Sequence, residues 1–180
     1  HTALDTRTTA AGTELFLSLG RVLVSAGDIR LSTANGQVLP APRSRLVISH
    51  NLPWQAGTQV QVLSGSASIK LARGDSLSLD AGQQVTFDSQ TDSTPRPVTV
   101  GADAWVNGLL IAERMPLGQV IAQLNLYRRG VVRCDPQVAA LRVSGSFSID
   151  RPDASLDLLT RVLPIRVQRV FGYWANVVAA

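Results

Sequence analysis

The segment from Thr58 to Asp88 constrains the fold most, because apolar and polar residues alternate through four successive short runs. The runs read TQVQVLSG, SASIKLARG, DSLSLDAG and QQVTFD, and most of them end in a turn that contains glycine. A period of two puts alternate side chains on opposite faces of a strand, so one face is buried. The pattern therefore predicts a mainly β first half, folded as a short-stranded solenoid or sandwich. The predicted inward face consists of Val60, Val62, Ile69, Leu71, Leu77, Leu79, Val85 and Phe87.

The hydrophobic period changes in the second half of the chain. A polar stretch with two prolines at 89–99 predicts a linker, and from Pro116 the apolar residues follow helical spacing. A second helix is predicted over Pro152–Val162. Short strands are predicted directly after Asn107-Gly108 and at 131–134, 141–149, 165–170 and 174–178.

The resulting order, β-α-β-β-α-β-β, indicates a small α+β unit after the β half. We therefore predict two domains, over 1–98 and 99–180. The predicted core of the second domain consists of Trp105, Leu117, Val120, Ile121, Leu124, Val143, Phe147, Leu156 and Leu159.

The charge distribution argues against a nucleic-acid partner. The net charge is +4, and the basic residues are sixteen arginines and one lysine, Lys70. The arginines are scattered, with no run longer than Arg128-Arg129, and aromatic residues do not alternate with them. Proteins that bind single strands combine a continuous basic groove with a stacking platform of aromatic side chains, and this pattern is missing here.

Residues that carry catalysis or bind metals are scarce. The only histidines are His1 and His50, and Cys134 is the only cysteine. A zinc site needs a cluster of such ligands, and a cysteine nucleophile needs a basic partner. We therefore expect no enzyme activity, no catalytic or metal-binding residues and no cofactor. Arg73-Gly74-Asp75 matches an adhesion tripeptide, but its position between two predicted strands favours a tight turn.

Five stretches of the chain carry recognisable motifs: Asp5–Glu14, Arg21–Ile29, Val60–Val85, Trp105-x-x-Gly-x-Leu with the helix from Pro116 to Arg128, and Val143–Ser148. Together they resemble the FecR family of anti-sigma regulators. The last two resemble the secretin/TonB short N-terminal (STN) domain that follows in this family. The chain departs from the family pattern where Leu19-Gly20 runs directly into Arg21, without an intervening strand pair.

The resemblance implies an all-β FecR-type domain over 1–98 and an STN-like α+β subdomain over 99–180. It implies the periplasmic region of a single-pass inner-membrane protein, whose membrane helix and cytoplasmic segment lie outside this sequence. Such regulators bind the periplasmic signalling domain of an outer-membrane TonB-dependent transducer. They relay iron-siderophore status to an extracytoplasmic-function sigma factor, and regulatory proteases release that factor. A second hypothesis is a cell-wall or carbohydrate-binding β-domain without a signalling role, which leaves the second half unexplained.

The candidate partner-binding surface follows the first predicted helix. Leu126 and Tyr127 lie off the apolar stripe of that helix, and Arg128, Arg129 and Arg133 follow within a few residues. Tyrosine and arginine are enriched where protein interfaces gain most of their affinity. These five residues are our hypothesis for partner binding. The alternative interpretation is that Tyr127 caps the core and that the arginines are merely solvated.

Overall fold

A computed structural model gives the structure of residues 2–9, 12–25 and 29–180. The chain divides into two compact units, residues 1–99 and 100–180. The assignment of these units as FecR-type and STN-like domains stays a prediction. The family-like turn that we predict at Ala26–Asp28 lies outside the described residues.

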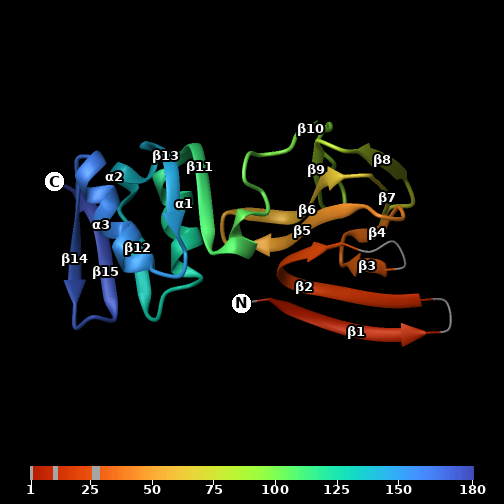
Figure 1. Cartoon of the computed structure of the whole chain (residues 1–180), viewed down its shortest axis with the longest axis horizontal. Helices are drawn as coiled ribbons and strands as arrows, with labels where there is room; N and C mark the ends of the chain where they lie inside the picture. Colours follow the sequence, from red (N-terminus) through yellow and green to blue (C-terminus); the bar gives the residue numbers. More distant parts are fainter. Residues whose placement is uncertain (1, 10–11, 26–28) are drawn as a thin grey trace. The chain divides into compact units, whose positions relative to one another are not determined.

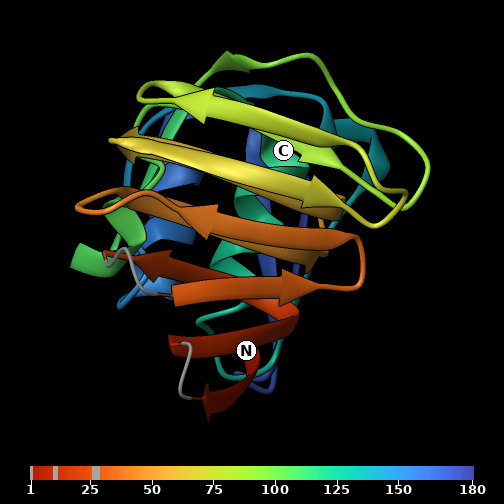
Figure 2. The same cartoon turned by 90° about the vertical axis from the view of Figure 1, so that its right-hand side faces the viewer.

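The first unit is one curled sheet, with ten strands in the residues that the structure describes (Figures 1 and 2). Nine strands follow the order β10-β9-β6-β5-β2-β3-β4-β7-β8, and β1 pairs with β2. The sheet curls back on itself, since β8 contacts both β9 and β6 from the opposite half. The strands are β1 Ala3–Thr9, β2 Gly12–Val24, β3 Ile29–Thr33, β4 Gly36–Pro40, β5 Arg45–Leu52, β6 Gln55–Ser64, β7 Ser66–Leu71, β8 Ser76–Asp80, β9 Gln83–Phe87 and β10 Arg96–Pro97.

The mainly β first half is confirmed, but the solenoid form is wrong. A solenoid stacks the strands of successive repeats on one another, whereas the ladders described in this unit are antiparallel, apart from β2 with β3. The long β2 joins the two halves of the sheet. Its residues Thr13–Phe16 pair with β3, and its residues Gly20–Val24 pair with β5. Apolar and polar residues alternate in the same way in a solenoid and in a curled antiparallel sheet, so the sequence pattern does not distinguish the two architectures.

The core of the first unit is aliphatic apart from Phe87. The side chains predicted to face inward from Val60 to Phe87 are buried, except that Leu77 on β8 is only half-buried. Full burial of one such side chain stabilises the fold by about 1.5–3 kcal/mol. The buried cluster consists of Leu17, Val24, Leu31, Val38, Leu46, Ile48, Val60, Val62, Ala67, Ile69, Leu71, Leu79, Val85 and Phe87.

The segment predicted as a linker is folded onto the first unit, so that prediction is wrong. Its Arg96–Pro97 forms β10 and pairs with β9. Arg73, from the β7–β8 turn, donates to the Gln90 carbonyl oxygen at 2.7 Å and forms ion pairs with Asp92 and Asp75. Prolines predicted a break because they cannot donate to a ladder, yet an edge strand such as β10 tolerates them.

The second unit places its helices between two small sheets (Figure 1). A two-stranded sheet contains β11 and β13, and a three-stranded sheet has the order β12-β15-β14. Helix α1 contacts β11 and β12, and α3 contacts β13 and β14, so each of these helices touches both sheets. The elements are η1 Ala104–Asn107, β11 Leu109–Pro116, α1 Leu117–Asn125, β12 Val131–Cys134, α2 Pro136–Ala139, β13 Arg142–Ser148, α3 Pro152–Val162, β14 Ile165–Val170 and β15 Trp174–Ala179.

The predicted helix over Pro152–Val162 is confirmed, and the short α2 was not predicted. Trp105 lies in a 3₁₀ turn that ends at Gly108 in the left-handed conformation, and it packs against the core. The other eight residues of the predicted core belong to the buried cluster of this unit. That cluster consists of Leu110, Ala112, Leu117, Val120, Ile121, Leu124, Val132, Val138, Val143, Phe147, Ile149, Leu156, Leu159, Ile165, Ala175 and Val177.

Candidate protein-interaction surface

The turn between β14 and β15 exposes an unusual group of aromatic side chains. Phe171 is 99% exposed, Tyr173 is 55% exposed and Trp174 is 43% exposed. Phe171 and Gly172 both have positive φ angles, 50° and 68°. A positive φ favours Asn, Asp or Gly, and a left-handed conformation costs a residue with a Cβ atom about 1–2 kcal/mol. Phe171 is therefore unfavourable here for two reasons, its backbone conformation and its exposed ring.

The side chain of Arg128 holds this turn in place. Its Nη1 donates to the carbonyl oxygens of Tyr173 at 3.0 Å and Arg129 at 3.1 Å, and its Nη2 donates to the Gly172 carbonyl oxygen at 3.0 Å. Its Nε pairs with Asp153 Oδ1 at 2.9 Å. The Arg128 side chain is only 4% exposed, so the guanidinium links the end of α1, the turn and the start of α3 in a buried position.

The backbone also fixes the turn against β12. The N–H of Val131 donates to the Tyr173 carbonyl oxygen at 3.0 Å. Gly130 has a φ of 99°, and a Cβ atom at this position would collide with the same Tyr173 oxygen. Only glycine allows the two segments to come this close. The exposed turn is therefore supported by at least three contacts from the segment that follows α1.

The outer face of the three-stranded sheet continues the surface. Because Val132, Ala175 and Val177 are buried toward the helices, their neighbours in sequence face outward. Arg133 lies over the Trp174 ring, with its Cζ atom 5.5 Å from the ring centroid. The strands of this sheet contain no acidic residue. The outward-facing set is Val131, Arg133, Arg166, Gln168, Val170, Trp174, Asn176 and Val178.

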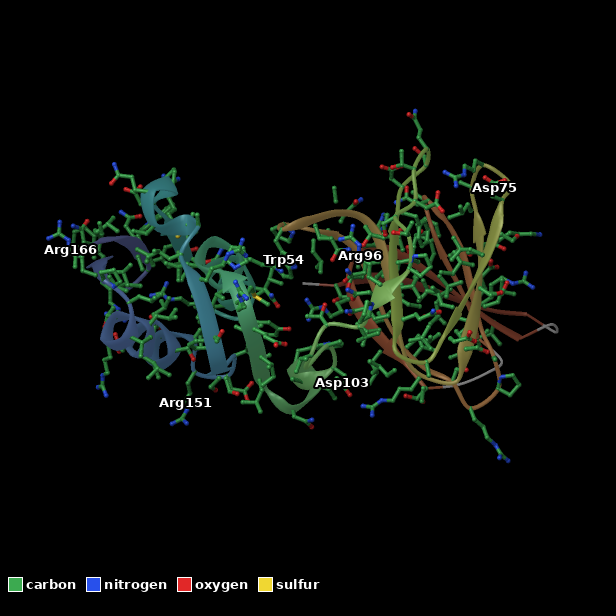
Figure 3. All side chains as sticks on the ribbon, turned by 90° about the horizontal axis from the view of Figure 1, so that it is seen from above. Trp54, Asp75, Arg96, Asp103, Arg151 and Arg166 are labelled. Carbon is green, nitrogen blue, oxygen red and sulfur yellow. The ribbon has the colours of Figure 1, made fainter. Side chains whose placement is uncertain are left out.

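The arginines of β14 differ in direction. Arg169 faces the helices, where its Nη2 pairs with Asp157 Oδ1 at 2.7 Å. Arg166 projects from β14 to the outside of the unit (Figure 3). The outward charges of the three-stranded sheet are thus Arg133 and Arg166, both positive. We call the outward-facing set, together with Tyr127, Arg129, Phe171 and Tyr173, the aromatic–arginine surface.

The five predicted partner-binding residues do not share one environment. Tyr127, Arg129 and Arg133 are exposed, while Leu126 is half-buried. Arg128 is committed to the turn and offers almost no surface to a partner. The sequence analysis did not select Phe171, Tyr173 and Trp174. The available signal was Phe171 directly before Gly172, where a turn favours a small polar residue.

Other candidate residues of the chain are used in its fold. The Cys134 thiol is half-buried, and burial, followed by the charge of Asp135, raises its pKa, which disfavours the reactive thiolate. Arg73 of the adhesion-like tripeptide is paired with Asp75 and Asp92. Over the described part of the chain, no group of three or more His, Cys, Asp or Glu side chains is placed to hold a metal ion. No helix there has the length and apolar character needed to cross a bilayer.

His50 is buried within a polar network of the first unit. Its Nδ1 lies 2.8 Å from Thr58 Oγ1, and its Nε2 lies 3.1 Å from Asn51 Nδ2. The Gly57 N–H donates to Asn51 Oδ1 at 3.1 Å, which orients the amide so that its nitrogen faces the ring. Nε2 therefore accepts a hydrogen bond and the neutral ring donates from Nδ1. Burial lowers the pKa of His50, in agreement with this neutral state.

Two crystal structures of a "putative anti-sigma factor" from Parabacteroides distasonis ATCC 8503 are similar to this chain over nearly all of its length. The first has a TM-score of 0.75 at 14% sequence identity, over 100% of this chain and 96% of that chain. The second has a TM-score of 0.75 at 15% identity, over 97% of this chain and 83% of that chain. No protein-family model and no curated protein matches the sequence. The chain therefore has an anti-sigma-factor-like fold across both of its units.

Proposed function

We propose that this chain is the periplasmic sensor region of a FecR-type anti-sigma regulator, with an STN-like second unit and no enzyme activity. The second unit binds the periplasmic signalling domain of an outer-membrane TonB-dependent transducer. The binding relays iron-siderophore status to an extracytoplasmic-function sigma factor through the membrane and cytoplasmic parts of the same protein. Regulatory proteases then act on the regulator.

The likeness to the Parabacteroides structures supports the regulatory class, because it extends over both units rather than one common module. At this sequence identity the likeness concerns the fold, so the function rests on the site. The residues that carry the resemblance to the STN domain lie on α1 and β13, and in the turn around Trp105.

The single observation that carries the proposal is the aromatic–arginine surface. The side chains of Phe171, Tyr173 and Trp174 are exposed on a turn whose carbonyl oxygens accept hydrogen bonds from the nearly buried Arg128. Exposed aromatic residues on a rigid support, close to arginines, are typical of surfaces that bind other proteins.

The cell-wall or carbohydrate-binding hypothesis is weaker. Sugar rings stack on exposed aromatic faces, and the described residues of the first unit expose one aromatic side chain, Phe16. Trp54 is half-buried, and the Arg21 guanidinium lies over its ring at 5.8 Å. The first unit therefore presents no row of aromatic rings to a glycan.

Isothermal titration calorimetry tests the proposal directly. The full chain is titrated with purified periplasmic signalling domains of TonB-dependent transducers from the same genome. We expect one of these domains to bind with a dissociation constant of about 10 μM or tighter, an affinity of about 7 kcal/mol. The absence of binding by every such domain, to a chain that is folded by circular dichroism, would reject the transducer as partner.

A charge-reversal pair assigns the binding to the second unit. We expect Arg133→Glu to weaken the binding at least tenfold, about 1.4 kcal/mol, because it reverses a rim charge and removes the arginine from the Trp174 ring. Arg96→Glu is the matched control, since Arg96 is an exposed arginine on β10 of the first unit. Equal losses for the two variants would mean that only net charge matters and that the site assignment is wrong.

A further inference from the structure

We propose that Phe171 is the anchor of the interface and inserts into an apolar socket that is surrounded by carboxylates on the partner protein. This inference rests on the proposed function, because it names the contact through which the second unit binds. It goes further in assigning one residue that the sequence pattern did not select, and in defining the chemistry of the partner's surface.

The fold gives no reason for phenylalanine at position 171. The ring is 99% exposed, so it contributes no burial to the core of this chain. The backbone φ of 50° favours Asn, Asp or Gly over any large side chain. Residues in strained backbone conformations cluster at sites that act on another molecule.

The surroundings of Phe171 suit an inserted anchor. Val170 and Trp174 flank the turn as paired residues at the ends of β14 and β15. The Tyr173 and Trp174 rings meet edge to face at a centroid distance of 6.0 Å. Arg128 and the Val131 N–H already hold the turn, so little conformational freedom is lost on binding. Fixed aromatic residues of this kind contribute most of the affinity in many interfaces.

The charges around the anchor define the partner. The second unit contains nine arginines and no lysine against six acidic residues, a net charge of +3. Arg133 faces outward over the Trp174 ring, and Arg129 is exposed in the segment that follows α1. Arg166 faces outward on the same sheet, four residues before Val170 along β14. An acidic rim on the partner would pair with these guanidinium groups and would speed association at low salt. A second copy of this chain would instead bring arginine-rich faces together.

The variant Phe171→Asn distinguishes a role of the Phe171 ring in binding from a role of the turn. Asparagine before Gly172 suits the positive φ angles, so the variant keeps the turn and removes only the ring. Against the transducer signalling domain that binds the wild-type chain, we expect at least a 30-fold loss of affinity with no fall in the thermal midpoint. Phe16→Thr is the matched control, because Phe16 is the exposed phenylalanine of the first unit, and we expect less than a threefold change.

The ionic strength of the titration tests the acidic rim. Raising NaCl from about 50 mM to about 500 mM is expected to weaken binding of the wild-type chain at least tenfold, because the Debye length falls several-fold over this range. A salt-independent affinity would overturn the charged rim.

Three further outcomes would reject the inference, the proposed function, or both. Binding of the wild-type chain and of Phe171→Asn within threefold of each other would reject the anchor and leave the proposed function standing. No binding of the wild-type chain to any transducer domain would reject both. A wild-type dimer in sedimentation velocity that Phe171→Asn dissociates would assign the socket to a second copy and overturn the acidic partner.

Discussion

The two units of this chain treat polar and aromatic groups in opposite ways. In the first unit, polar side chains are buried inside the curled sheet, where Thr58 Oγ1 contacts His50, Thr33 and Asn35. In the second unit, only Gln123 and Ser155 are buried polar residues among those that the structure describes, and a nearly buried arginine supports exposed aromatic residues. A buried hydrogen-bond network makes the core of a domain rigid and unique. Exposed aromatic side chains on a rigid support are typical of surfaces that bind another protein. We therefore propose that the first unit is a scaffold and that the second unit carries the binding surface.

The largest expected effect concerns the contact between Gly130 and the turn. Gly130→Ala places a methyl group against the Tyr173 carbonyl oxygen at a positive φ, so we expect a loss of about 2–5 kcal/mol in unfolding free energy. Gly172→Ala is the matched control, because its Cβ would meet nothing within 4 Å, and it should lose only about 1–2 kcal/mol. Urea unfolding followed by circular dichroism measures both. Equal losses would show that the turn is not seated against the segment after α1.

The next effect separates two arginines of the candidate surface. Arg128→Ala removes hydrogen bonds to three carbonyl oxygens from a buried position, so we expect a loss of about 2–3 kcal/mol in stability. Arg133→Ala removes one exposed contact with the Trp174 ring and should lose less than about 1 kcal/mol. The same unfolding experiment decides. If Arg133→Ala is the more destabilising variant, Arg128 does not support the turn.

In the first unit, the His50 network predicts a dependence of stability on pH. The pKa of His50 is lowered in the folded chain by burial, relative to 6.5 in the unfolded chain. The neutral His50 ring therefore contributes its full stabilisation of the folded chain above pH 6.5. This contribution is lost as the pH falls through the pKa of His50 in the folded chain. The slope reaches at most about 1.4 kcal/mol per pH unit.

The variant His50→Gln tests this assignment. Its unfolding free energy should fall less than that of the wild-type chain between pH 7.5 and pH 5.5, since the titrating ring is gone. Parallel losses in the two proteins over this range would place the pH dependence at other groups and remove His50 from the account.

The smallest expected effect is a gain in stability. Phe171→Asn replaces a strained residue with one that suits the turn, so we expect a rise of about 0.5–1 kcal/mol in unfolding free energy. Differential scanning calorimetry measures the matching rise in the thermal midpoint. A clear fall would mean that the Phe171 ring stabilises the fold, which contradicts its exposure and the contrast between the two units.

The sequence predicts strongly periodic elements well and long-range pairing poorly. The helix at Pro152–Val162 follows from a first-turn proline and a regular apolar stripe, which are local signals. The curled sheet depends on β2 pairing with both β3 and β5, and no local pattern records such a register. The polar composition and the two prolines of segment 89–99 predicted a linker. The ion pair of Asp92 with Arg73, which fixes this segment to the first unit, depends on a distant residue and leaves no local signal in the sequence.

The candidate site was predicted in part for a similar reason. Tyr127, Arg129 and Arg133 stand out in sequence by type and position, and the structure places them on the surface. The role of Arg128 depends on the carbonyl oxygens of Gly172 and Tyr173, more than forty residues away. Phe171 becomes notable only once its φ angle and its exposure are known together.

Hydrogen–deuterium exchange of the full chain, with and without the transducer signalling domain that binds it, tests the central claim most directly. We predict that protection increases over residues 126–133 and 170–176, which carry the aromatic–arginine surface, and that β1 and β2 of the first unit exchange as before. Protection confined to the first unit, with an unchanged turn at Phe171 and Gly172, would contradict the assignment of binding to the second unit.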